Sequence, residues 1–241
     1  SFPEKSDKEL VKISKKFYHH FVDVFIEMIK SFTVSKEAVY KRYTYPNIDF
    51  FTELYKDGKS VVLVGPHYAN WEWIMSLDSF VAYKGYAAFT KVNNKYFNNK
   101  ILKSRTKFGT SLVQTSKIIS EIKYNQANNI QAMYGLLSDQ SPQIKKTFYW
   151  SEFLGVKVPI HTGAEMLAKR YDLNMVFMDV KKVKRGHYET TFSLITNNAP
   201  KFKDYQLTDI FIEKVEKQIR TKPEFYFWTH KRFKHKDKAP E

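Results

Sequence analysis

The chain has 241 residues, of which 43% are hydrophobic and 17% aromatic, so it is a packed globular protein and not a disordered one. Its 40 Lys and Arg residues against 25 Asp and Glu residues give a formal charge of +15, which favours nucleic acid, an anionic membrane, a phosphorylated substrate or an acidic carrier protein as partner. The absence of cysteine excludes disulfides, thiolate metal sites and a cysteine nucleophile.

The first predicted element is an amphipathic helix over residues 6–32. Ser6 and Glu9 have the spacing of a capping box, and apolar residues recur from Leu10 onwards at three- and four-residue spacing. We expect residues 1–35 to pack on the core as an N-terminal amphipathic helix, with a role at a membrane surface as the alternative. No apolar run in the chain reaches the ~18 residues that span a bilayer.

A buried strand, a turn and a second amphipathic helix are predicted between residues 60 and 83. Residues 61–64 are consecutive apolar β-formers, and a Gly-Pro pair ends this run. Asn70 is a candidate N-cap for the following helix, which places Glu72 in its first turn. His67 then lies in the turn at the carboxyl end of the strand, where open α/β sheets place their ligand sites.

His67 and Glu72 are therefore candidates for a general-base dyad. Neutral imidazole accepts a proton near pH 7, and a carboxylate on its other ring nitrogen fixes the tautomer and supports the imidazolium. Because His67 precedes the helix and Glu72 lies inside it, the two side chains can converge. The alternative is an exposed turn histidine and a glutamate that complements the helix dipole, since His-x-x-x-x-Glu is a weak pattern by itself.

Strands and helices alternate along the rest of the chain. After short helices and loops at 36–58, the predicted strands are 86–92, 111–114, 130–137, 175–183, 188–195 and 225–228. The predicted helices are 94–108, 115–126, 162–171 and 207–221, with an irregular loop or hairpin at 143–160. We expect one domain over residues 1–241, an α/β fold with a mixed sheet flanked by helices, and a frayed basic tail at 229–241.

Two further segments carry candidate binding residues. Asp139 and Gln140 follow an apolar predicted strand and lie on the same expected sheet edge as His67, although a loop-capping role for Asp139 is the alternative. Residues 228–234 combine aromatic and basic side chains, which suit a nucleic-acid platform, an anion clamp for a phosphorylated substrate, or a solvated tail. The P-loop, G-x-G-x-x-G, G-x-S-x-G and H-E-x-x-H motifs are absent.

Four sequence motifs follow one another in a specific order. They are His-x4-Glu at 67–72, Gly-x-x-x-Asp-Gln at 135–140, a Phe-Leu-Gly-Val and Thr-Gly-Ala-x-x-Leu-Ala pair at 153–168, and Trp-x-His-Lys-Arg-Phe-Lys at 228–234. Over about residues 1–235, this order and spacing resemble the late acyltransferases of lipid A biosynthesis, of the lauroyl and myristoyl type. That family belongs to the lysophospholipid acyltransferase superfamily, whose general motif is His-x4-Asp or Glu.

The resemblance implies a fold like that of glycerolipid acyltransferases and a specific reaction. A fatty acyl chain would pass from an acyl-carrier-protein thioester to a hydroxyl of a lipid A precursor. His67 would deprotonate that hydroxyl and Glu72 would orient His67, with neither a cofactor nor a metal required. The implied substrate-binding residues, which include arginines for phosphate or sugar-acid groups, are Asn70, Arg105, Asp139, Gln140, Arg170, His230 and Arg232.

The resemblance also implies partners and a location. We expect an acyl-carrier protein, an anionic lipid acceptor and the inner-membrane surface as partners, and no nucleic acid. The predicted location is the cytoplasmic face of the bacterial inner membrane. We expect the helix around Phe17, Phe21 and Phe25 to lie near that membrane, and a spanning helix to precede Ser1 in the natural chain.

Departures from the family pattern leave the acceptor open. The family often has an Arg-Pro pair near Thr90 and Lys91, and neither residue is present here; Lys231 replaces an arginine of the closing motif. The first alternative is therefore the same chemistry on a glycerolipid or an amino-acid lipid. The alternative from another class, a nucleic-acid-binding protein, rests on the charge and on residues 228–234.

Overall fold

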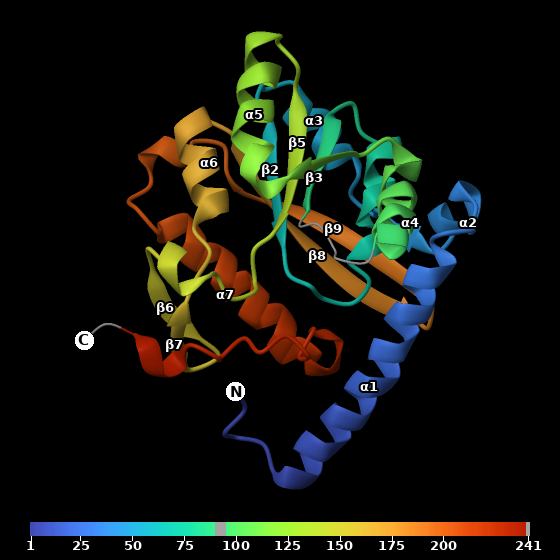
Figure 1. Cartoon of the computed structure of the whole chain (residues 1–241), viewed down its shortest axis with the longest axis vertical. Coiled ribbons are helices and arrows are strands. Elements are labelled where there is room, and N and C mark those ends of the chain that lie inside the picture. Colours follow the sequence, from blue (N-terminus) through green and yellow to red (C-terminus); the bar gives the residue numbers. More distant parts are fainter. Residues whose placement is uncertain (90–94, 240–241) are drawn as a thin grey trace.

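A seven-stranded mixed sheet lies at the centre of the protein (Figure 1). The structure is a computed structural model, and it describes residues 1–89 and 95–239. Its strand order is β1-β9-β8-β2-β5-β3-β4, in which β8 and β9 pair antiparallel and the other neighbours pair parallel. The strands are β1 (Tyr43–Thr44), β2 (Val61–Gly65), β3 (Lys84–Phe89), β4 (Ser111–Gln114), β5 (Ala132–Leu137), β8 (Asn174–Lys184) and β9 (His187–Thr196). The predicted mixed α/β fold is confirmed.

Helices surround this sheet, and a small separate hairpin lies beside it. The helices are α1 (Asp7–Lys30), α2 (Lys36–Tyr40), α3 (Asp49–Tyr55), α4 (Lys95–Arg105), α5 (Ile118–Ala127), α6 (Gly163–Tyr171) and α7 (Gln206–Thr221). The hairpin consists of β6 (Trp150–Phe153) and β7 (Val156–Pro159), within the segment predicted as a loop or hairpin. Short 3-10 turns are η1 (Glu72–Ser79), η2 (Thr106–Phe108), η3 (Thr115–Lys117), η4 (Ile144–Lys146), η5 (Ala199–Lys201), η6 (Pro223–Phe225) and η7 (Lys236–Lys238).

The central strands β2 and β5 position the turns that matter most for the site. Every residue of β2 is buried, as expected for a run of Val and Leu in a parallel sheet covered on both faces. β2 pairs with β5 in a parallel register that sets Gly65 opposite Leu137. The chain therefore leaves the sheet at two neighbouring points on the same edge. Residues 90–92 of the strand predicted at 86–92, with Thr90 and Lys91, lie outside the described residues.

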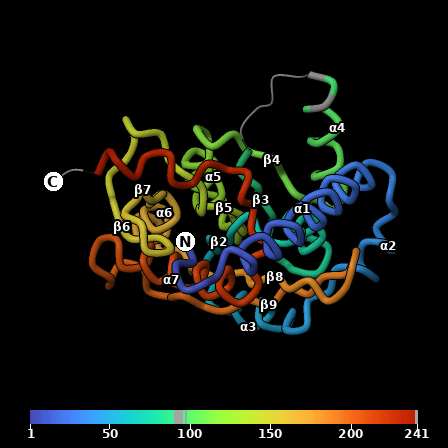
Figure 2. The backbone as a smooth tube through the Cα atoms, turned by 90° about the horizontal axis from the view of Figure 1, so that it is seen from below, coloured from blue at the N-terminus to red at the C-terminus, as the bar shows by residue number. Residues whose placement is uncertain are grey.

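Helix α1 forms as its sequence predicts. The Glu9 carboxylate accepts a hydrogen bond of 2.9 Å from the Ser6 backbone N–H, and the Ser6 hydroxyl accepts one of 3.4 Å from the Glu9 N–H, which completes the capping box. Figure 2 shows α1 running from the neighbourhood of α7 towards α2. Its buried residues, three and four positions apart, are Phe17, His20, Val24 and Glu27. Within residues 1–89 and 95–239, no helix is both long and apolar enough to cross a bilayer.

The helix predicted after Asn70 is a 3-10 helix instead of an α-helix. In η1 the buried residues Trp73 and Ser76, and likewise Ile74 and Leu77, lie three positions apart, which matches the 3-10 repeat. The Ser76 hydroxyl also donates a 2.8 Å hydrogen bond to the Trp73 carbonyl and so competes with α-helical bonding.

The predictions for the C-terminal segment are wrong in two respects. Residues 225–228 do not form a strand, because Pro223 begins the 3-10 turn η6 and the following residues make a single bridge, Tyr226 to Tyr68. The tail is folded through residue 239 and not frayed. The Arg232 side chain is buried, and its carbonyl accepts a 2.8 Å hydrogen bond from the Ser141 hydroxyl.

His20 links the packing of α1 to pH. The ring is 4% exposed and its Nδ1 lies 3.1 Å from Nζ of Lys182, on β8. Burial, and then the positive charge of Lys182, lower the pKa of His20 to about 4. The imidazole is therefore neutral at pH 7, and it accepts a hydrogen bond from the lysine.

We expect His20 to make the protein less stable in mild acid. The unfolded chain binds a proton at His20 near pH 6.5, whereas the folded chain does so only near pH 4, so stability falls as the pH drops through this interval. His20 alone lowers the free energy of unfolding by up to about 3 kcal/mol across this interval. Urea unfolding of the wild type and of His20→Gln at about pH 7 and about pH 5 measures it. Equal pH dependence of the two proteins would contradict the assignment.

Candidate functional site

His67 and Asp139 meet at the carboxyl ends of the adjacent strands β2 and β5. Gly65 and Leu137 are paired in the parallel register, so the residues two positions further along leave the sheet side by side. Nδ1 of His67 lies 2.7 Å from Oδ1 of Asp139. Asp139 thus makes the contact with His67 that was predicted for Glu72.

Asp139 is held as a buried anion. Its side chain is 1% exposed, and burial alone would raise the pKa of its carboxyl. The charge of His67 and the hydrogen bonds from His67 outweigh burial and hold the pKa of Asp139 below its usual range. When the ring is neutral, the ionised carboxylate accepts its Nδ1 proton, which leaves the lone pair of His67 on Nε2. The His67 side chain is 20% exposed, so this nitrogen can reach a ligand.

Glu72 binds Arg105 and not His67. Nε of Arg105 donates a 2.9 Å hydrogen bond to Oε2 of Glu72, and Nη2 of Arg105 contacts Oε1. The Glu72 charge outweighs burial and raises the pKa of Arg105. The expected convergence of His67 and Glu72 does not occur, because β5 delivers Asp139 to Nδ1 while the last residue of α4 takes both Glu72 oxygens. His67, Glu72 and Arg105 all line one cavity, whereas Asp139 is not among its lining residues.

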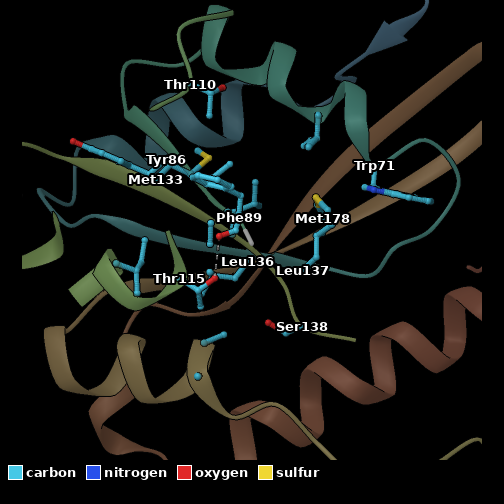
Figure 3. Close-up of a pocket in the computed structure, with 18 of the residues that line it drawn as sticks. Trp71, Tyr86, Phe89, Thr110, Thr115, Met133, Leu136, Leu137, Ser138 and Met178 are labelled. Atoms are coloured by element: carbon cyan, nitrogen blue, oxygen red, sulfur yellow. Dashed lines mark hydrogen bonds between the residues drawn. The ribbon is translucent and has the colours of Figure 1, made fainter. Parts of the chain in front are cut away.

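An apolar cavity of about 610 Å³ opens beside His67. It lies between η1, β3, β5, β8, α5 and α6, and Figure 3 shows that Tyr86, Met133, Leu136 and Met178 gather in it. Its polar lining includes His67, Glu72, Arg105, Ser138 and Gln140. Small-ligand sites have volumes of about 300–1,000 Å³ and a few polar groups in an apolar wall. The cavity suits an apolar chain with its polar end at His67.

The C-terminal segment supports the turn that carries His67. The Phe227 N–H donates a 3.1 Å hydrogen bond to the His67 carbonyl, and the Ala69 N–H donates one of 2.9 Å to the Phe225 carbonyl. The Phe227 ring lies 6.2 Å from the His67 ring and 5.0 Å from the Trp71 ring, and Trp71 meets His67 edge-on at 5.4 Å. Sequence reasoning missed this support because a hydrophobic run does not reveal its partner.

Other predicted site residues are divided between the cavity and its surroundings. Gln140 lines the cavity. His230 accepts a 3.0 Å hydrogen bond at Nε2 from the Ser141 N–H, so it holds the loop that follows Asp139. Arg170 is exposed on α6, lies over the Tyr171 ring and is not among the residues that line the cavity.

Arg232 and Asn70 lie inside the protein. The Arg232 side chain is 2% exposed and its guanidinium lies 5.0 Å from the Phe153 ring centroid. Among the residues that the structure describes, its three nitrogens have no hydrogen-bond partner; burial lowers the pKa of Arg232, and Tyr226 and Asp139 oppose this effect. Asn70 is 1% exposed and bonds to protein groups. Neither side chain lines the cavity.

Comparison with protein families matches residues 1–235 to the family described as bacterial lipid A biosynthesis acyltransferase. A comparison with curated proteins finds no match. The matched range contains the His67 turn, the Asp139 loop, the cavity lining and the C-terminal support. In the described parts of the chain, no group of three His, Cys, Asp or Glu side chains has a metal-binding arrangement.

Proposed function

Because the chain belongs to the bacterial lipid A biosynthesis acyltransferases, we propose that it moves a fatty acyl chain from an acyl-carrier-protein thioester to a hydroxyl of a lipid A precursor. The observation that carries this proposal is the hydrogen-bonded His67–Asp139 pair beside a cavity lined mostly by apolar side chains. The cavity would hold the acyl chain, with the thioester carbonyl at His67. The reaction would take place at the cytoplasmic face of the inner membrane.

His67 would act as the general base. Nε2 takes the proton of the acceptor hydroxyl as the oxygen attacks the thioester carbonyl carbon, and Asp139 stabilises the resulting imidazolium. The tetrahedral intermediate then breaks its carbon–sulfur bond, and the imidazolium returns the proton to the departing thiolate. The products are the acylated acceptor and the free carrier thiol, so no external oxidant or reductant is needed.

Arg105 would stabilise negative charge in the cavity. Two of its nitrogens are engaged by Glu72, and a guanidinium carries five N–H donors, so further donors remain for an oxyanion or a phosphate. The Trp73 N–H is not an oxyanion donor here, because it donates a 3.0 Å hydrogen bond to Oδ1 of Asn70. Glu72 would thus act on the reaction through the position of Arg105.

The first prediction for this proposal compares three side chains in one assay. Incubation with an acyl-carrier donor and hydroxylated lipid acceptors should release the carrier thiol, and His67→Ala should slow this by ~10²–10⁴-fold. Asp139→Asn should lower kcat more than Glu72→Gln, because Asp139 touches the base directly. Phosphorylated lipid A precursors, glycerolipids and amino-acid lipids should be compared as acceptors, since the same site chemistry serves each.

Circular dichroism and melting temperature are the controls, because loss of a buried charge also destabilises a fold. A folded His67→Ala protein with near-normal turnover would refute the proposed base. A larger kcat loss in Glu72→Gln than in Asp139→Asn would refute the division of roles between the two carboxylates. No thiol release from any acceptor by the folded wild type on vesicles would count against acyl transfer itself.

The outer face of α1 supports the proposed membrane location. Phe17 is buried, so it is not part of this face, but an apolar stripe is exposed and consists of Val11, Tyr18, Val22, Phe25, Ile26 and Ile29. Exposed lysines lie on the same helix at positions 8, 12, 15, 16 and 30. An amphipathic helix of this kind binds the interface of an anionic bilayer through both features.

We expect co-sedimentation with vesicles to increase with their anionic lipid content and to decrease with salt. Combined Val22→Ser, Ile26→Ser and Ile29→Ser substitutions should weaken this binding, because they remove apolar area from the stripe. The matched control is Tyr124→Ser with Phe148→Ser, two large exposed side chains outside α1, which should change little. Binding that ignores lipid charge and salt, or that the control weakens equally, would contradict the role of α1.

A further inference from the structure

The inner face of α1 contacts the turn that carries His67. Nδ2 of Asn70 donates a 2.7 Å hydrogen bond to Oε2 of Glu27, and Oδ1 of Asn70 accepts the Trp73 N–H at 3.0 Å. Glu27 lies on the last turns of α1 and Asn70 lies three residues after His67. One amide side chain thus joins the N-terminal helix to the start of η1.

The Glu27 carboxylate is itself fixed from a third element. The Tyr188 hydroxyl, on β9, donates to Oε2 of Glu27 at 2.8 Å and lies 3.1 Å from Oε1. Glu27 and Tyr188 are both nearly fully buried. A second contact lies one turn away, where Nε1 of Trp73 donates a 2.8 Å hydrogen bond to the Ser31 hydroxyl. The carboxylate is therefore a rigid acceptor between the sheet and the His67 turn.

The His67 turn needs such support because its backbone is strained. Ala69 has φ of 50°, a left-handed conformation that a residue with a Cβ adopts only when its surroundings impose it. The Ala69 N–H is held on one side by the Phe225 carbonyl, and the next residue, Asn70, is held on the other side by Glu27. Both contacts thus flank the left-handed residue that lies two positions after His67.

We infer that Glu27 is a positioning residue for the proposed acyl transfer: through Asn70 it holds the left-handed turn that places His67 against Asp139. The inference rests on the proposed function for its activity readout. It assigns the inner face of α1 a role in positioning the active site, separate from the role proposed for its exposed outer face. If α1 only covered the core, an apolar side chain of similar size at position 27 would serve equally well.

Two substitutions of Glu27 and one matched control test this inference. Glu27→Leu keeps the approximate size but removes the acceptor, so kcat should fall by about 10- to 100-fold with little change in KM. Glu27→Gln retains one oxygen for Asn70 and Tyr188 and should keep most of the activity. The control is Asp23→Asn, which weakens the ion pairs of the same helix to Lys182 and Arg185 without touching the turn, and should keep the wild-type kcat.

Exchanging the amide and the carboxylate between positions 27 and 70 tests whether the hydrogen bond between them, and not only the packing of α1, supports activity. Asn70→Asp alone places two carboxylates in contact and should lower kcat by at least about 10-fold. Adding Glu27→Gln restores a donor and an acceptor, because the new amide can donate to the new carboxylate. Recovery of activity in the double variant is expected. A double variant no better than Asn70→Asp would overturn the inference.

Hydrogen exchange of the backbone amides of residues 66–73 gives a readout that does not depend on activity. In folded Glu27→Leu these amides should exchange faster than in the wild type, while those of β2 and β5 should not change. Normal protection and normal kcat in Glu27→Leu, or an equal kcat loss in Asp23→Asn, would overturn the role of Glu27. An inactive wild type with the predicted exchange pattern would instead count against acyl transfer and leave the structural link intact.

Discussion

The parallel register between β2 and β5 is the constraint on which the site depends. It sets Gly65 opposite Leu137 and therefore brings His67 and Asp139 together, with 2.7 Å between Nδ1 of His67 and Oδ1 of Asp139. Both strands lie in the interior of the sheet, where a shift of one residue would turn every buried side chain to the other face. The packing of the core thus fixes the register, and the register fixes the pair. Among the described residues, Asp139 forms its ion pair with His67.

Segments far apart in the sequence complete the environment of this pair. The N-terminal helix holds Asn70, the C-terminal segment holds the backbone of His67, and α4 brings Arg105 to Glu72. Between them the structure leaves a cavity with an apolar wall and a charged end. A cavity with an apolar wall and a charged end suits a substrate that has a long hydrocarbon chain and a reactive carbonyl. Burial of the hydrocarbon chain favours binding, and the side chains at the charged end can act on the carbonyl.

The sequence predicted those features that local chemistry decides. The apolar run of β2 and the capping box of α1 both formed as expected. It also placed Asp139 on the same sheet edge as His67. It did not identify which carboxylate contacts the ring, because that choice depends on strand pairing between residues 72 positions apart. The burial of Arg232 was missed for the same reason: its surroundings come from β6 and the β5 loop, and a basic tail looks solvated when considered alone.

A co-crystal structure with a non-hydrolysable acyl-carrier donor analogue, in which an amide replaces the thioester, tests the central claim most directly. The predicted result is an acyl chain inside the cavity between Tyr86, Met133 and Met178, its carbonyl carbon beside His67, and the His67–Asp139 hydrogen bond intact. An acyl chain bound outside this cavity, or a carbonyl held at Glu72 with His67 turned away from Asp139, would contradict the account.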